Sequence, residues 1–350
     1  MISGARAKSG YSMMKIIKIY KALFLILLLA LPLRAGDYAA DFLRIGVGAR
    51  SAAMGGAFVA VADDPTAFYW NPAGLSNVRR IGLHVDHVPM FDGIAQYNVV
   101  NFALPLRNNM TLAVGWIRLG VDEIPRYASL QGTRLDRLTK GMYRSSGIAD
   151  GYFADAEDAV MVSFSKKLTF DLGLGPKSRM MIIPIELSFG MTGKFIHQKL
   201  DDKVGIGQGV DMGILVRAVS RDVVNGEAKS WLGVGLHARD LSRTSITWNT
   251  ASKQNDRAES AFVLGLAGST YFESFDSRLT VSIDQEVAPY VETHTGVEFS
   301  FLNVAALRAG FVNDSFAAGA GLRFSRFCVD YAFVTHDLGN THRVSGGVSF

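Results

Sequence analysis

Histidine and cysteine, the residue types that most often hold a metal or act as nucleophiles, are few and scattered in this sequence. His84 and His87 are separated by an odd number of positions in a segment that alternates like a strand, so their side chains point to opposite faces and cannot share a metal. His84 and Asp86 share a face, but two ligands are too few. Cys328 is the single cysteine and has no activating partner near it in the sequence, and it excludes an intramolecular disulfide. We predict no metal site.

Two glycine motifs fail the tests for nucleotide binding. In GMTGKF, residues 190–195, the glycines are too close together for a phosphate loop, and Phe195 stands where a serine or threonine would hold magnesium. GIGQG, residues 205–209, is not followed by a helical pattern, as a dinucleotide-binding turn requires. The sequence also lacks a Gly-x-Ser-x-Gly elbow. We therefore predict that the protein is not an enzyme and binds no cofactor.

The segment from Gly46 to Ser76 is the most informative part of the sequence. Its first half is almost entirely glycine, alanine, serine and valine, so its backbone can lie close against a wall. The run Asp63-Asp64-Pro65 predicts an N-cap followed by proline at the first helical position, and Asn71-Pro72 repeats the pattern. We expect two short helical turns in a segment that suits a narrow lumen, which describes a plug rather than a catalyst.

ADDPTAFYWNPAGLS, residues 62–76, resembles the N-terminal signature of the FadL-like outer-membrane barrels, especially their PorV/PorQ branch. In that family a hatch ending in Asn-Pro-Ala sits inside the barrel lumen. The resemblance also covers strand pairs such as residues 195–200 with 209–216, and so runs through most of the chain. It assigns plug roles to Asp63, Asp64, Pro65, Asn71, Pro72, Ala73 and Gly74, together with the aromatic run Phe68, Tyr69 and Trp70.

The resemblance implies two alternative functions. PorV-like proteins serve type IX secretion by engaging exported cargo at the cell surface, which implies a partner-binding barrel. FadL-like barrels transport hydrophobic small molecules passively across the outer membrane, which is the alternative. Both place the protein in the cell outer membrane of a diderm bacterium, in contact with outer-membrane lipid.

Residues 1–35 have the pattern of a secretory signal peptide. Three lysines precede an apolar run from Ala22 to Leu33, which is too short to span a bilayer as a helix. We predict cleavage after Ala35, with translation starting at Met1 or at Met13 or Met14. Removing the six basic residues of this leader turns the net charge of +4 into −2. The basic balance therefore belongs to the leader, and we expect no nucleic-acid partner.

From residue 80 onward the dominant pattern has a period of two, apolar then polar. Leu279, Val281 and Ile283, for example, alternate with polar residues. There is no continuous apolar run long enough for a transmembrane helix, whereas tilted strands of about 9 to 11 residues with one apolar face span a membrane as a barrel. We predict an all-β, antiparallel transmembrane barrel of about fourteen strands over residues 80–350, with a plug over residues 36–79. The expected strands cover 80–88, 96–106, 109–119, 157–169, 180–198, 207–219, 229–240, 258–272, 277–287, 292–301, 304–312, 316–324, 326–335 and 340–350.

A soluble β-sandwich also alternates with a period of two and is the competing fold. Phe350 argues against it, because a terminal aromatic residue that closes an alternating strand resembles the signal read by the barrel assembly machinery. We expect that machinery as a partner.

Polar residues at the strand positions that should face the lumen carry both signs of charge. We expect them to pair with one another and with the plug, and a selective ion path is the alternative.

The two longest polar connections, residues 120–156 and 241–257, follow odd-numbered strands and should be extracellular. The first is basic, and it lacks the apolar helical hairpins that we would expect of a fatty-acid collector. A charged partner, such as a secreted cargo protein or a type IX component, therefore fits better than a hydrophobic small molecule. The candidate contacts are Arg126, Arg134, Arg137, Lys140 and Arg144.

Overall fold

The computed structural model describes residues 39–143, 147–175, 181–221, 228–288, 291–336 and 339–350. The predicted signal peptide over residues 1–35 and its cleavage after Ala35 lie outside these ranges and stay predictions. Among the described residues, no helix is long and apolar enough to cross a membrane.

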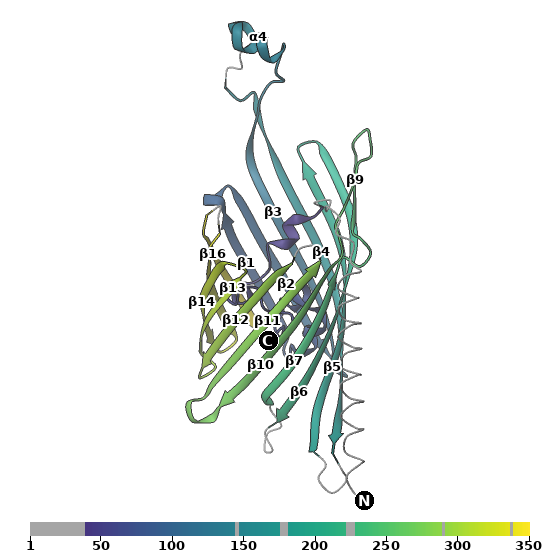
Figure 1. The fold of residues 1–350 in the computed structure, drawn as a ribbon, viewed down its shortest axis with the longest axis vertical. Coiled ribbons are helices and arrows are strands. Elements are labelled where there is room, and N and C mark those ends of the chain that lie inside the picture. The colour runs from purple at the N-terminus through teal and green to yellow at the C-terminus, as the bar shows by residue number, and fades with distance from the viewer. Residues whose placement is uncertain (1–38, 144–146, 176–180, 222–227, 289–290, 337–338) are drawn as a thin grey trace, which may run out of the picture. The chain divides into compact units, whose positions relative to one another are not determined.

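Fourteen strands of the described chain close into an antiparallel barrel, as the alternation predicted (Figure 1). β1 pairs with β16 and β5 pairs with β6, which completes the ring. The strands are β1 (Gly82–Met90), β2 (Ala95–Leu106), β3 (Met110–Arg126), β4 (Gly151–Leu174), β5 (Met181–Leu200), β6 (Lys203–Arg221), β7 (Ala228–Arg239), β10 (Ala261–Phe272), β11 (Ser277–Ala288), β12 (Glu292–Phe301), β13 (Ala305–Val312), β14 (Ser315–Phe324), β15 (Phe327–Val334) and β16 (Thr341–Ser349). We call the end where β1 begins and β16 finishes the terminal end, and the opposite end the distal end.

The outer face of the barrel is apolar and the inner face is mixed. On β11, Val281 is 53% exposed on the outside, whereas its neighbour Thr280 is 4% exposed and faces the lumen. A soluble sandwich would bury such apolar residues between two sheets, whereas a membrane barrel turns them to lipid. Large exposed apolar side chains recur around the ring: Leu83, Val100, Leu112, Val162, Phe195, Ile214, Val234, Leu266, Ile283, Phe299, Phe311 and Val344.

Residues 39–78 fill the lumen as the plug. They contain two 3₁₀ segments, η1 (Asp41–Arg44) and η2 (Pro72–Asn77), and two short helices, α2 (Ala49–Ala53) and α3 (Ala67–Trp70). The two predicted turns correspond to α3 and η2, whereas η1 and α2 were not predicted. Met54, Phe58, Phe68 and Leu75 have no exposed surface, so the plug is part of the core of the barrel.

Lumenal glycines let the plug backbone lie against the wall. A Cβ atom on Gly213 of β6 would overlap the Asn71 side chain, and one on Gly310 of β13 would overlap the backbone at Met54. Glycine inside a strand weakens it and often marks such a close approach. Glycine at these positions therefore lowers the strand propensity but leaves room for the plug to contact the wall.

Both predicted long loops are more ordered than expected. β3 and β4 extend beyond the predicted strands and form a hairpin that carries α4 (Arg134–Thr139) near its tip (Figure 1). Residues 241–257 are not a free loop, because they contain the hairpin of β8 (Ser245–Trp248) and β9 (Asn255–Arg257), which pairs with β6. Ile246 of β8 is fully buried, so this hairpin extends the wall at the distal end.

Candidate functional site

Arg50 of α2 is the centre of the contacts between the plug and the wall. Its Nε and Nη2 each lie 2.8 Å from a carboxylate oxygen of Glu298 on β12. Its Nη1 binds the predicted plug residues Asp63 and Asp64 at 2.5 and 3.0 Å. On the wall, Glu298 also accepts a hydrogen bond from Arg308, which binds Asp330. The two aspartates therefore hold an arginine, a role that the sequence analysis did not assign to them.

The predicted cap at Asp63-Asp64-Pro65 is wrong in detail. The Asp64 carboxylate accepts hydrogen bonds from the backbone N–H and the hydroxyl of Thr66, at 2.9 and 2.5 Å. Helix α3 begins only at Ala67, so Pro65 precedes the helix and does not occupy its first position. The local turn was predictable from the Asp-Pro chemistry, but the exact start of so short a helix was not.

The predicted cap at Asn71 is present. Its side-chain oxygen accepts from the Ala73 N–H at 3.1 Å, and Pro72 occupies the first turn of η2. The Asn71 amide nitrogen also donates to the carbonyl of Val59, at 2.8 Å, and to that of Ile214 on β6, at 3.3 Å. Asn71 thus joins two parts of the plug and the wall, and all three contacts are lost if its amide is removed.

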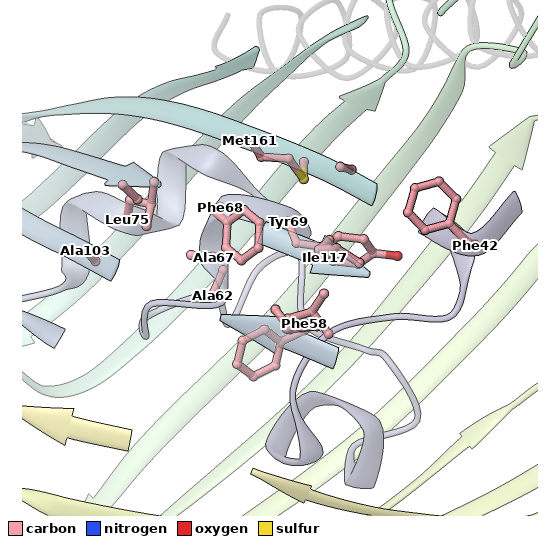
Figure 2. Close-up of a cluster of buried hydrophobic side chains, with 14 of the residues drawn as sticks. Phe42, Phe58, Ala62, Ala67, Phe68, Tyr69, Leu75, Ala103, Ile117 and Met161 are labelled. Atoms are coloured by element: carbon pink, nitrogen blue, oxygen red, sulfur yellow. The ribbon is translucent and has the colours of Figure 1, made fainter. Parts of the chain in front are cut away.

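The aromatic run Phe68-Tyr69-Trp70 holds the plug together. The Tyr69 hydroxyl donates to the carbonyl of Leu43 at 2.5 Å, and the Trp70 indole N–H donates to that of Val47 at 2.8 Å. Figure 2 shows Phe68 and Tyr69 in one cluster with Ile117 of β3 and Met161 of β4. Gly74, the last predicted plug residue, packs so closely against Ala62 that a Cβ atom would have no room.

Both charged and apolar side chains of the lumen wall contact the plug. Wall side chains on β11, β16 and β1 bind plug backbone: Asp284 accepts from the Val59 N–H, Asp86 from the Gly48 N–H, and Arg343 donates to two carbonyls. The apolar wall residues come from β1–β5 and β8: Val88, Tyr97, Val99, Ile117, Ala159, Met161, Ile196 and Ile246. They form one buried cluster with the plug aromatics. His84 contacts Asn101, and His87 contacts Asn98, so the two histidines occupy opposite faces as predicted.

The basic residues of the distal hairpin do not form one charged surface. Arg126 pairs with Asp201 in the turn between β5 and β6. Arg137 donates to the Gly132 carbonyl at 2.6 Å, and Lys140 pairs with Asp136 at 2.7 Å. Arg134 is exposed, and Arg144 lies outside the described residues. Hydrogen bonds from Lys140 and then from Thr133 lower the pKa of Asp136 to about 2, so this cap remains charged at neutral pH.

The same hairpin exposes apolar side chains, which corrects the expectation that it lacks them. Leu135 and Leu138 of α4 are 69% and 64% exposed, and Met142 is 83% exposed. Leu135 and Leu138 are three residues apart and share one face of α4, whereas Met142 lies in the following 3₁₀ turn, η4 (Gly141–Tyr143). The sequence analysis weighed only the charges of this segment and missed its exposed apolar residues.

Phe350, the predicted assembly signal, follows β16 directly. Its backbone N–H donates to the Ile81 carbonyl at 2.8 Å, and its side chain is 61% exposed on the outer parity. It therefore lies at the seam where the first and last strands meet.

One group of donors in the described chain has the spacing of metal ligands. Ligand atoms of Glu286, Glu292 and His294 lie within 4.8 Å of one another at the distal end of β11 and β12. The sequence analysis tested only His84 and His87 for this role and missed the group. A signal was present, because few residues separate these two predicted strands, and their antiparallel register pairs Glu286 with Glu292.

No protein-family model and no curated protein matches this chain. Among solved structures, the chain is similar to the toluene transporter TbuX of Ralstonia pickettii, at 13% identity over 87% of this chain and 98% of that one, with a TM-score of 0.44. A deltaS2 mutant of the monoaromatic hydrocarbon channel TodX matches at 12% identity over 87% and 99%, with a TM-score of 0.47. A FadL homologue of Pseudomonas aeruginosa matches at 11% identity over 84% and 96%, with a TM-score of 0.39. The barrel itself is established by the strand pairing.

Proposed function

We propose that this chain is an outer-membrane barrel whose plug keeps the lumen closed, and that it acts by binding a protein partner at the cell surface. The apolar outer face supports the membrane location. The distal end corresponds to the outside, where barrels of this kind carry their longer loops. The resemblance of the plug motif to the PorV/PorQ branch supports a role in type IX secretion, with exported cargo as the partner.

The distal hairpin is the observation that carries this proposal. Clusters of large apolar side chains that stay exposed in water mark interaction sites. Leu135, Leu138 and Met142 are all exposed near the tip of this hairpin, where Arg134 of α4 is exposed as well. A partner surface that is apolar and bordered by carboxylates fits this combination.

The experiment replaces Leu138 and Met142 by serine in the chromosomal copy and measures how much exported cargo the cells display at their surface. We expect displayed cargo to fall several-fold while barrel abundance is unchanged. Serine at Val304 and Phe324, exposed apolar residues at the terminal end, is the matched control. Unchanged display in the hairpin variant, or a genome without other type IX components, would contradict the proposal.

The second candidate function is FadL-like passive transport of a hydrophobic small molecule. Two observations favour it. Ile117, Met161 and Ile196 of the lumen wall belong to the same buried apolar cluster as the plug aromatics. The distal hairpin also exposes apolar side chains, which is the feature expected of a fatty-acid collector. This function requires the plug to move away from those lumenal side chains. An apolar ligand that copurifies with the barrel, and is lost when Ile117 is changed to Glu, would favour transport over partner binding.

A further inference from the structure

We propose that Glu286, Glu292 and His294 bind a divalent transition-metal ion of the zinc type at the distal edge of the plug. The three side chains come from the lumenal faces of β11 and β12. Glu286 pairs directly with Glu292 in the strand register, and His294 pairs with Asp284. Their donor atoms lie within 4.8 Å of one another.

The donor set fits the chemistry of such an ion. Zinc binds imidazole nitrogen and carboxylate oxygen at about 2.0 to 2.2 Å, with tetrahedral geometry. Two tetrahedral ligand atoms then lie about 3.4 Å apart. The donors, which lie within 4.8 Å of one another, therefore need to close by at most about 1.4 Å, which is within reach of side-chain rotation. Three protein ligands leave a fourth position for water.

The orientation of His294 supports the site independently of its charge. Its Nδ1 lies 2.8 Å from the Gly55 carbonyl oxygen, so Nδ1 must donate its proton there. In the neutral ring the other nitrogen, Nε2, then carries the lone pair, and it lies 3.8 Å from a carboxylate oxygen of Glu292. Metal-ligating histidines are usually held in this way, with one ring nitrogen bound to a carbonyl and the other aimed at the metal.

A buried carboxylate oxygen points to the same place. Glu286 is 4% exposed, and its Oε2 accepts from Arg239. Its Oε1 accepts no hydrogen bond among the described residues and has only an ion pair with Arg44, whose Nη1 lies 3.5 Å away. A buried acceptor without a hydrogen bond costs stability. A bound cation would satisfy it.

Arg44, the last residue of η1, stands at this site as a competitor. Its Nη1 lies 3.5 Å from Glu286 and its Nη2 lies 3.7 Å from Glu292, and its side chain is 31% exposed. The guanidinium and the metal need the same two carboxylates. Metal binding therefore displaces Arg44 and removes its two ion pairs with the wall, while Arg343 still holds the neighbouring carbonyls of Ile45 and Gly46.

The test is equilibrium dialysis of zinc against the tag-free, metal-stripped barrel in detergent. We expect one zinc ion per barrel, with affinity falling at least tenfold in Glu292→Gln and in His294→Gln. Arg44→Gln should bind zinc several-fold more tightly, because the competitor is gone. Heat-modifiable migration in gels shows that each variant is folded.

His342→Gln and Arg243→Gln are the controls, since they remove an exposed histidine and an exposed arginine outside the site. Neither should change zinc affinity. Three outcomes would overturn the proposal: no stoichiometric binding, binding that survives both ligand variants, or weaker binding in Arg44→Gln. The assigned class of metal would be wrong if calcium bound the wild type as tightly as zinc does and bound His294→Gln equally tightly.

Discussion

Arg50 of the plug and Glu298 of the barrel wall form a bidentate ion pair, with both nitrogen–oxygen distances at 2.8 Å, across 248 residues of sequence. Both residues are less than 10% exposed. A planar guanidinium fits a carboxylate with two parallel hydrogen bonds, which a lysine ammonium cannot do. This pair therefore fixes α2 in one place against β12.

We predict that Arg50→Ala loosens the plug while the barrel stays assembled. Removing one partner of a buried pair typically costs about 3 to 5 kcal/mol, because the other charge is left uncompensated. Hydrogen exchange should accelerate in residues 47–76 and stay unchanged in the β11 and β12 ladder. Arg50→Lys keeps the positive charge but cannot make two parallel hydrogen bonds to Glu298, so its plug should exchange at an intermediate rate. Protection of the plug at the wild-type level in Arg50→Ala would show that the pair does not hold it.

Asn71→Ala should have a milder effect of the same kind. Losing a capping side chain costs about 0.5 to 2 kcal/mol, and such a loss raises the population of an open minor state several-fold. Brief openings in single-channel recordings should become several-fold more frequent. Asn98→Ala is the control, because Asn98 faces outward and contacts His87. Its openings should be as rare as those of the wild type. If the two variants behave alike, the cap has no part in closing the lumen.

The lumenal glycines provide a steric test. Gly213→Val places side-chain atoms where Asn71 and Pro72 of the plug lie, so the plug must shift. Gly193→Val is the matched control on β5, because a Cβ atom there meets nothing within 4 Å. We expect limited proteolysis to cut within the plug of Gly213→Val and to leave Gly193→Val intact. Equal resistance of the two variants would contradict the close approach of plug and wall.

The strands were predictable from the sequence, but the contacts of the plug were not. The alternation around Val281 is a local pattern, and it locates β11 within one residue of its observed end. Arg50 and Glu298 have no local pattern in common, because only the closed barrel brings them together. From the sequence, Gly213 and Gly310 would only weaken their strands. Their role becomes clear when the plug is seen to lie directly against them. β8 and β9 are so short, at four and three residues, that they fell within a predicted loop.

Val281→Arg should destabilise the barrel by about 2 to 4 kcal/mol, as a cation on the lipid face near the midplane does. Val291→Arg changes an even more exposed valine, but one in the distal link between β11 and β12, and should cost much less. Reversible folding in lipid vesicles against denaturant measures both. An equal loss in the two variants would mean that Val281 does not face the membrane core.

The most direct test of the closed lumen is single-channel recording of the barrel without residues 46–76 in planar bilayers, beside the wild type. Only heat-modifiable, assembled protein is recorded, so a folding failure cannot pass for a closed channel. We predict a wild type with almost no conductance and a deletion variant with a large, steady one, because the contacts of Arg50 and Asn71 hold a plug that fills the lumen. A deletion variant that conducts no better than the wild type would contradict the account.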